Sequence, residues 1–210
     1  MQLRAWLGLP LAPVLRLPDA LARPVARIAD GLTWLGWRSP LRTTAMREIE
    51  HGVLGDSTAW QATTGTRLLT LRETLQQMPA TVQEHWFARL FLLKPMLVLT
   101  LAAFWCATAV IAIVNPRPAL SLLAAAGIEG IAAQAVVFGG AAVDALLGLV
   151  VLHRRGLRAA ALAMVAVTVG YLVGGTLLLP SLWLDPLGPL VKPIPAAALA
   201  LVLLAIADDR

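Results

Sequence analysis

A run of 22 apolar residues, IAAQAVVFGGAAVDALLGLVVL at residues 131–152, constrains most strongly what this chain can fold into. A helix of about 20 apolar residues is long enough to cross the hydrocarbon core of a bilayer. The run contains one carboxylate, Asp144, which at that depth must face other protein or water rather than lipid. Gly140, Asp144 and Gly148 share one helical face, and small residues there allow a neighbouring helix to approach. The sequence therefore predicts a membrane bundle organised around this face.

Three more apolar segments accompany this run, and together they predict four membrane spans at about 96–114, 131–152, 159–179 and 190–207. Hydrophobic residues make up 59% of the chain and the mean hydropathy is +0.76, which is too apolar for an ordinary soluble domain. We expect an all-α fold: a four-transmembrane-helix bundle at residues 90–210, preceded by a helical, linker-like region at residues 1–89.

The charged residues are unevenly distributed, and their distribution predicts the orientation in the membrane. Residues 1–94 hold 11 of the 17 Lys and Arg residues, and the turn at 153–158 holds three more. Because basic loops stay in the cytoplasm, both termini and this turn are expected on the cytoplasmic side of a bacterial-type inner membrane. No basic cluster is interleaved with aromatic residues, so the expected partner is the lipid bilayer and not nucleic acid.

The first 94 residues contain signals for short helices separated by helix breakers. Ser39 followed by Pro40 predicts the start of a helix over 41–51, which Gly52 should end. Asp56 is expected to cap a short piece through Trp60. Two capping boxes follow, Thr70 with Glu73 and Thr81 with Glu84, and the second opens the helix that leads into the membrane.

Polar residues next to that membrane entry suit the headgroup level of a bilayer. Trp86, Arg89 and Lys94 are of the types that concentrate at the membrane surface. Pro95 follows directly and is expected to kink the helix as it enters the bilayer. Upstream, residues 1–40 contain leucines and tryptophans without an obvious core, so they are expected to lie on the membrane or against a partner.

Asp144 is the centre of the predicted intramembrane polar site. Four side chains that can donate hydrogen bonds fall at about its depth in the first and third spans: Trp105, Thr108, Thr168 and Tyr171. The fourth span offers only apolar side chains between Pro195 and Ala207. We therefore predict that Asp144 faces the first and third spans and bonds to at least one of the four. Such a carboxylate is either a functional group or a structural latch between helices.

The loop between the last two spans is rich in proline, which restricts its backbone. It carries Asp185 and Lys192, and Pro186, Pro189 and Pro193 lie among and beside them. We expect an ordered loop that folds over the outer mouth of the bundle.

The sequence contains no catalytic motif, and a catalytic or metal-binding role is not expected for this chain by itself. Cys106 is the only cysteine, which excludes an intramolecular disulfide or dithiol pair. The chain has no GxGxxG nucleotide fingerprint and no Tyr-x-x-x-Lys motif. Any electron carrier must therefore lie on another protein or domain.

Several segments resemble the DoxX-like family of four-helix membrane proteins over residues 90–210. They are FLLKPMLVLTLAAFW, GGAAVDALLG, HRRGLRAAALA and, as the most specific piece, LLLPSLWLDPLGPLVKPIPA. The resemblance implies a membrane location and a loose link to redox metabolism. It carries over Asp144 as the acid of the second span, and Asp185 and Lys192 in the loop before the fourth.

The preceding stretch, from GLTWLGWRSPLRTTAMREIEHGVLGD through PATVQEHWFARLFLLKP, is similar to a linker found in fused bacterial proteins. There it joins an NAD(P)-binding, epimerase-like or short-chain-dehydrogenase-like domain to a DoxX-like domain. The resemblance implies a chain carrying the end of such a fusion, as a truncated product, a product with a mis-assigned start, or a split partner.

This resemblance favours a membrane module that anchors or partners an NAD(P)-binding oxidoreductase, on which any NAD(P) would be bound. Two alternatives remain open: a quinone-linked redox subunit, and a small-solute transporter that uses Asp144 as a proton site.

Overall fold

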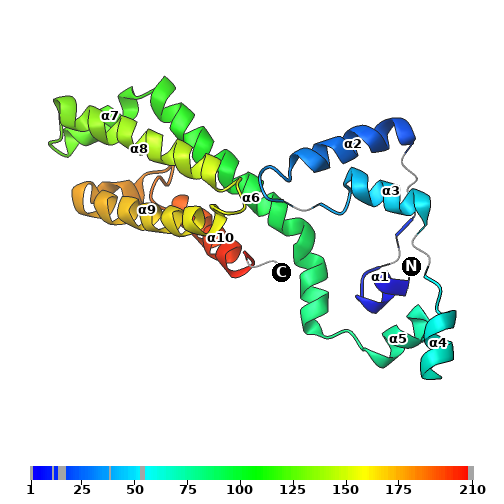
Figure 1. Ribbon diagram of the computed structural model, residues 1–210. Coiled ribbons are helices and arrows are strands. Elements are labelled where there is room, and N and C mark those ends of the chain that lie inside the picture. Colours follow the sequence, from blue (N-terminus) through cyan, green and yellow to red (C-terminus); the bar gives the residue numbers. More distant parts are fainter. Residues whose placement is uncertain (1, 11, 14–17, 38, 53–54, 208–210) are drawn as a thin grey trace. The chain divides into compact units, whose positions relative to one another are not determined.

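The computed structural model describes residues 2–10, 12–13, 18–37, 39–52 and 55–207, and within these ranges every regular element is a helix. The chain divides into two compact units, residues 1–92 and residues 93–210. The long helix α6 (Val82–Val114) begins in the first unit and continues into the second. Figure 1 shows the order of the helices along the chain.

The first unit consists of short helices and the beginning of α6. Its short helices are α1 (Gln2–Trp6), α2 (Asp19–Gly31), α3 (Thr43–His51), α4 (Thr58–Thr64) and α5 (Leu71–Gln77). Helices α2 and α3 pack against each other, and Ala26 and Ala29 of α2 are buried. The predicted short-helix character of this region is confirmed.

The start of α3 differs from the prediction, because a residue distant in sequence caps it. Asp30 of α2 accepts hydrogen bonds from the Thr43 hydroxyl at 2.7 Å, the Thr43 backbone N–H at 3.4 Å and Arg42 Nε at 3.3 Å. The Thr43 hydroxyl is the main reason that the pKa of Asp30 lies below its ordinary value. Ser39 instead accepts from the Leu41 N–H in a local turn, so the predicted helix start at Ser39 and Pro40 is wrong.

The other helix ends of this unit follow local chemistry. Asp56 accepts the N–H of Thr58 at 2.9 Å, but α4 continues to Thr64, beyond the predicted end at Trp60. It stops at Gly65, whose φ of +65° terminates the helix in the left-handed conformation. The capping box of α5 is confirmed: Thr70 and Glu73 bond to each other's backbone N–H groups.

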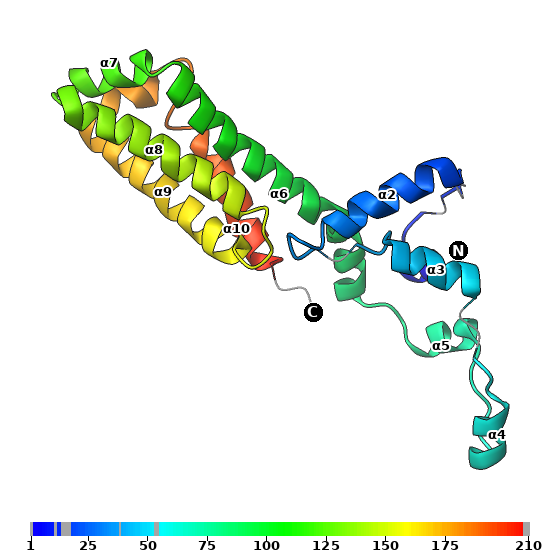
Figure 2. The same ribbon diagram turned by 45° about the horizontal axis from the view of Figure 1, so that its top comes forward.

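The second unit is a bundle of apolar helices. After α6 come α7 (Arg117–Ala125), α8 (Gly130–Val150), α9 (Leu157–Leu178), the 3-10 helix η1 (Pro180–Leu184) and α10 (Pro193–Ala205). Figures 1 and 2 show the span portion of α6 lying with α8, α9 and α10, and α7 across the end opposite the C-terminus. This arrangement places η1 and α7 at the same end of the bundle.

Two glycines of the bundle allow neighbouring parts of the chain to pack closely against them. A Cβ at Gly148 of α8 would lie 2.6 Å from Cys106 Sγ and 3.0 Å from the Cys106 backbone nitrogen on α6. A Cβ at Gly175 of α9 would lie 2.7 Å from Leu190, which is completely buried. A Cβ at Gly140 would meet nothing within 4 Å. Of the two glycines predicted to permit close approach beside Asp144, Gly148 therefore does so and Gly140 does not.

Three of the predicted spans are long enough to cross a bilayer: Leu93–Val114, Gly130–Val150 and Leu157–Leu178. The last predicted span is shorter than expected. Helix α10 has 13 residues, because residues 185–192 form turns and Pro193 and Pro195 occupy its first turn. At about 1.5 Å per residue this helix alone is shorter than the hydrocarbon core of about 30 Å. The structure therefore shows three long apolar helices and one shorter one.

Candidate functional site

Asp144 and Thr108 form a hydrogen bond between α8 and α6. Thr108 Oγ1 donates to Asp144 Oδ2 at 2.9 Å, and Asp144 is half-buried. Asp144 lies six residues before the end of α8 at Val150, which is too deep in the span for its short side chain to reach the headgroups. The expected hydrogen bond from one of four side chains is therefore present, and Thr108 is the donor.

The Thr108 hydroxyl has a second acceptor close by. Its oxygen lies 2.8 Å from the carbonyl oxygen of Trp105, one turn earlier on α6. A hydroxyl carries one proton, so it is shared between this carbonyl and the Asp144 carboxylate or alternates between them. Because the Trp105 carbonyl competes for this proton, the hydrogen bond from Thr108 to the Asp144 carboxylate is weaker than an unshared one.

Trp105, three residues before Thr108 on α6, is buried, with 5% of its surface exposed. Within the described ranges its indole Nε1 is the buried side-chain atom that has no hydrogen-bond partner. A buried N–H without an acceptor is costly, and an ordered water or a small polar molecule would satisfy it. Trp105, Thr108 and Asp144 are called the polar cluster below.

The two predicted partners on α9 take other roles. The buried Thr168 hydroxyl donates to the Met164 carbonyl of its own helix at 2.7 Å. Tyr171 is 48% exposed on the bundle surface. Within the described part of the chain, hydrogen bonds to Asp144 therefore come from α6 and not from α9. A threonine hydroxyl can bond to a carbonyl of its own helix, and the rotation of a helix about its axis decides whether a tyrosine faces inward. The expected depth of a residue in its span therefore did not show which of the four donors bonds to Asp144.

The loop residues Asp185 and Lys192 are separated by a turn. Asp185 accepts the Leu187 N–H at 2.8 Å, and Gly188 follows with φ of +59°. This turn directs Leu190 into the bundle, where it packs against Gly175. Lys192 is exposed and immediately precedes α10. The loop is thus anchored by its leucine, and the role of Asp185 seen here is to form the turn.

Lys94 is a polar residue whose burial the sequence did not predict. It was expected at the headgroup level; it lies at the start of the span that begins at Leu93, is 7% exposed, and its Nζ donates to the Ala207 carbonyl oxygen at 3.2 Å. Ala207 follows α10, so a cation lies at the C-terminal end of that helix, where the helix dipole favours positive charge. Only the fold brings residues 94 and 207 together.

These groups limit the chemistry available to the described residues. Among them, no cluster of three or more His, Cys, Asp and Glu side chains is arranged to hold a metal ion. The polar cluster offers one carboxylate, one hydroxyl and one indole N–H. Such a set can hold a proton, a water molecule or one small polar group, but it contains no paired acid and base for hydrolysis or group transfer.

Three long apolar helices and a shorter one, arranged as a bundle, define the class: this is a multi-pass α-helical membrane protein. Residues 102–201 match the model of the DoxX-like family. The matched segment contains all seven predicted site residues: Trp105, Thr108, Asp144, Thr168, Tyr171, Asp185 and Lys192. No curated protein and no solved structure matches the chain.

Proposed function

We propose that this protein is a membrane module that anchors or partners an NAD(P)-binding oxidoreductase at the inner membrane. The observation that carries the proposal is the surface of the first unit. Along one face of α2, Leu21, Val25, Ile28 and Leu32 are all exposed, at fractions of 57%, 39%, 68% and 40%. A contiguous exposed apolar face of this kind marks an interaction site.

The rest of α2 supports a protein partner for this face. Ala26 and Ala29 on a neighbouring face of the helix are buried and α2 packs against α3, so the exposed apolar face is presented by a pair of packed helices. Trp34, just after the helix, adds an aromatic side chain that is 88% exposed. Tryptophan is one of the residue types that most often dominate the binding energy of protein interfaces. The linker-like sequence of this region favours an oxidoreductase domain as the partner.

In-cell photo-crosslinking tests the proposal. A benzophenone amino acid at Val25 or Trp34 should form adducts with an NAD(P)-binding oxidoreductase in membranes of the native host, identified by mass spectrometry. The same probe at Leu146, an exposed residue of α8, serves as the lipid-facing control and should not. Adducts at Val25 and Trp34 that contain no NAD(P)-binding protein would contradict the proposal.

The polar cluster supports a second candidate, a small-solute transporter in which Asp144 carries the proton. Its specific observation is the half-buried carboxylate bonded to Thr108, with the unsatisfied Trp105 indole one turn away from Thr108 on α6. Intramembrane carboxylates often mark proton paths. Asp144→Asn should then abolish proton-coupled solute movement in reconstituted vesicles while expression stays normal. Normal coupling in that variant would exclude Asp144 as the proton site.

A quinone-linked redox subunit is the remaining alternative. In that case the electron carrier belongs to the partner, and a crosslinked complex should reduce a soluble quinone at the expense of NAD(P)H. A complex that binds NAD(P)H but leaves the quinone oxidised would favour the anchoring role.

A further inference from the structure

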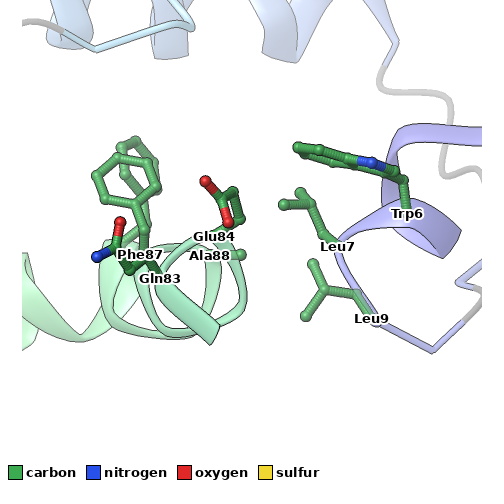
Figure 3. Close-up of a pocket in the computed structure, with 8 residues that line it drawn as sticks. Trp6, Leu7, Leu9, Gln83, Glu84, Phe87 and Ala88 are labelled. Atoms are coloured by element: carbon green, nitrogen blue, oxygen red, sulfur yellow. The ribbon is translucent and has the colours of Figure 1, made fainter. Parts of the chain in front are cut away.

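An apolar groove lies in the first unit between the N-terminal segment and the first turns of α6. Its volume is about 640 Å³. Figure 3 shows Trp6, Leu7 and Leu9 on one wall and the α6 side chains on the other, facing each other across an open space. The α6 wall consists of Gln83, Glu84, Phe87, Ala88 and Phe91.

Two contacts hold the N-terminal wall in place, and a third closes its own turn. The Trp6 indole Nε1 donates to the Met78 carbonyl oxygen at 2.6 Å. Gly8, with φ of +63°, packs against His85, whose Nε2 would lie 3.2 Å from a Cβ at that position. Arg4 closes the following turn by donating to the Pro10 carbonyl oxygen at 2.8 Å and 3.1 Å. The groove is therefore a built feature of this unit and not a chance gap.

The walls determine what kind of molecule fits. Phe87 and Phe91 are 62% and 49% exposed toward the surroundings and form an aromatic pair with centroids 5.9 Å apart. The polar end holds Glu84, whose carboxylate accepts the Thr81 N–H at 2.7 Å and the Thr81 hydroxyl. Those bonds keep the pKa of Glu84 below its ordinary value, so the carboxylate stays negative and disfavours an anionic ligand. The groove suits an uncharged hydrocarbon chain.

The position of the groove along α6 identifies the source of such a chain. Phe91 precedes Leu93, the first residue of the span, by two residues on the same helix. The neighbouring Trp86 is 64% exposed and Arg89 is also exposed, a combination typical of the membrane surface. The apolar end of the groove thus adjoins the helix segment that enters lipid.

We propose that this groove binds a hydrocarbon chain of a bilayer lipid. The residues Trp6, Leu7 and Leu9 on one side and Phe87, Ala88 and Phe91 on the other enclose the chain. The volume falls within the range of about 300–1,000 Å³ that is usual for small-molecule sites. The proposal goes beyond the anchoring function and is independent of any oxidoreductase, because it concerns a different surface from the α2 face.

Quenching by brominated lipid tests the proposal. Full-length protein with Cys106→Ala and one new cysteine is labelled with bimane and placed in nanodiscs of phosphatidylcholine and phosphatidylglycerol with brominated chains. A label at Leu7 should lose fluorescence to an extent comparable with a label at Val110, an exposed residue of the first span. A label at Thr64 at the end of α4 should remain bright.

Matched variants separate binding in the groove from other causes of quenching. Phe87→Ser with Phe91→Ser should restore the fluorescence at Leu7, whereas Trp60→Ser on α4 should leave it quenched. The Val110 label, quenched in every variant, confirms insertion.

Three results would overturn the proposal. A bright Leu7 label would exclude lipid, and quenching that persists in the phenylalanine double variant would place Leu7 on the bilayer outside the groove. A bright label together with disulfides between copies, formed in a separate unlabelled sample of the Leu7 cysteine variant, would indicate a second protein copy.

Discussion

At the scale of single residues, the bond between Thr108 and Asp144 is the best-defined interaction within the membrane bundle. It joins α6 to α8 and occupies one oxygen of a carboxylate that would otherwise lack a protein donor in the described part of the chain. Interhelical hydrogen bonds of this kind make modest contributions to membrane-protein stability, because the unfolded helices also find partners. The importance of the pair for stability is therefore measurable but small.

A double-mutant cycle measures this contribution. Thr108→Val should lower the free energy of unfolding by about 0.6–1.7 kcal/mol, because the carboxylate loses its donor. In an Asp144→Leu background the same change should cost much less, since the acceptor is gone. Asp144→Asn should retain the fold, because an amide oxygen still accepts from Thr108. Steric trapping in bicelles gives the free energies, and additive effects of the two substitutions would show that the bond contributes nothing.

Gly148 and Gly140 form a matched pair for testing helix approach. Gly148→Ala places a methyl group 2.6 Å from Cys106 Sγ and 3.0 Å from the Cys106 backbone nitrogen, so α6 and α8 must separate. We expect a loss of about 1–3 kcal/mol in the free energy of unfolding, as for other overpacked sites. Gly140→Ala meets nothing within 4 Å and should be neutral. Equal effects of the two substitutions in a thermal-unfolding assay would contradict the close contact.

At the scale of elements, the short helix α5 depends on its capping box. Glu73 accepts the Thr70 N–H at 2.7 Å, the Thr70 hydroxyl at 2.8 Å and Arg67 at 2.5 Å. These bonds, with the Thr70 N–H as the largest contribution, lower the pKa of Glu73 from 4.5 to about 2. The carboxylate is exposed, so its effect is a local one on the start of the helix.

The lowered pKa predicts how α5 responds to acid. Because the folded value lies below the unfolded one, the stabilisation is complete above pH 4.5 and is lost as the pH falls toward about 2. Protection of the amides at the start of α5, measured as the exchange rate relative to the intrinsic rate at each pH, should therefore fall over this range in the wild type. Thr70→Ala should show fast exchange already at pH 6, and Glu73→Gln should remove the pH dependence. Unchanged protection between pH 5 and pH 2.5 in the wild type would contradict the capping role.

At the scale of the whole molecule, the orientation in the membrane is the main property to measure. The basic turn with Arg154, Arg155 and Arg158 lies between α8 and α9, and the turn around Leu187 lies between α9 and α10. In the bundle these two turns are at opposite ends, because α9 connects them. A protein with this topology must expose them on opposite sides of the membrane.

Reporter fusions test the orientation. Fusions after His153 and after Arg210 should both report a cytoplasmic location, and a fusion after Leu187 should report an external one, since basic loops remain inside. Substituting Arg154, Arg155 and Arg158 by Ser should weaken this preference and produce mixed orientation. An external signal after Arg210 would show that α10, with its 13 residues, does not return across the bilayer, and a cytoplasmic signal after Leu187 would overturn the four-span topology.

Local features of this protein followed from its sequence alone. The three long spans required only continuous apolar length, and the capping box at Thr70 required only residues three positions apart. Of the second predicted box, Glu84 accepts the Thr81 N–H as expected, whereas the Thr81 hydroxyl accepts from Gln83. The all-α character and the need to satisfy Asp144 within the bundle also follow from the chain by itself, because a bilayer offers unpaired polar groups no partner. The match to the DoxX-like family over residues 102–201 agrees with the resemblance to that family noted in the sequence of residues 90–210.

The tertiary structure alone decided which distant residues meet. It selected Thr108 over three other donors, placed Asp30 on the start of α3, buried Lys94 at the end of α10, and made Gly148 rather than Gly140 the point of close approach. Periodicity and spacing determine which residues share a face of one helix. They do not determine the rotation and offset between helices, which depend on how all side chains of the bundle pack together.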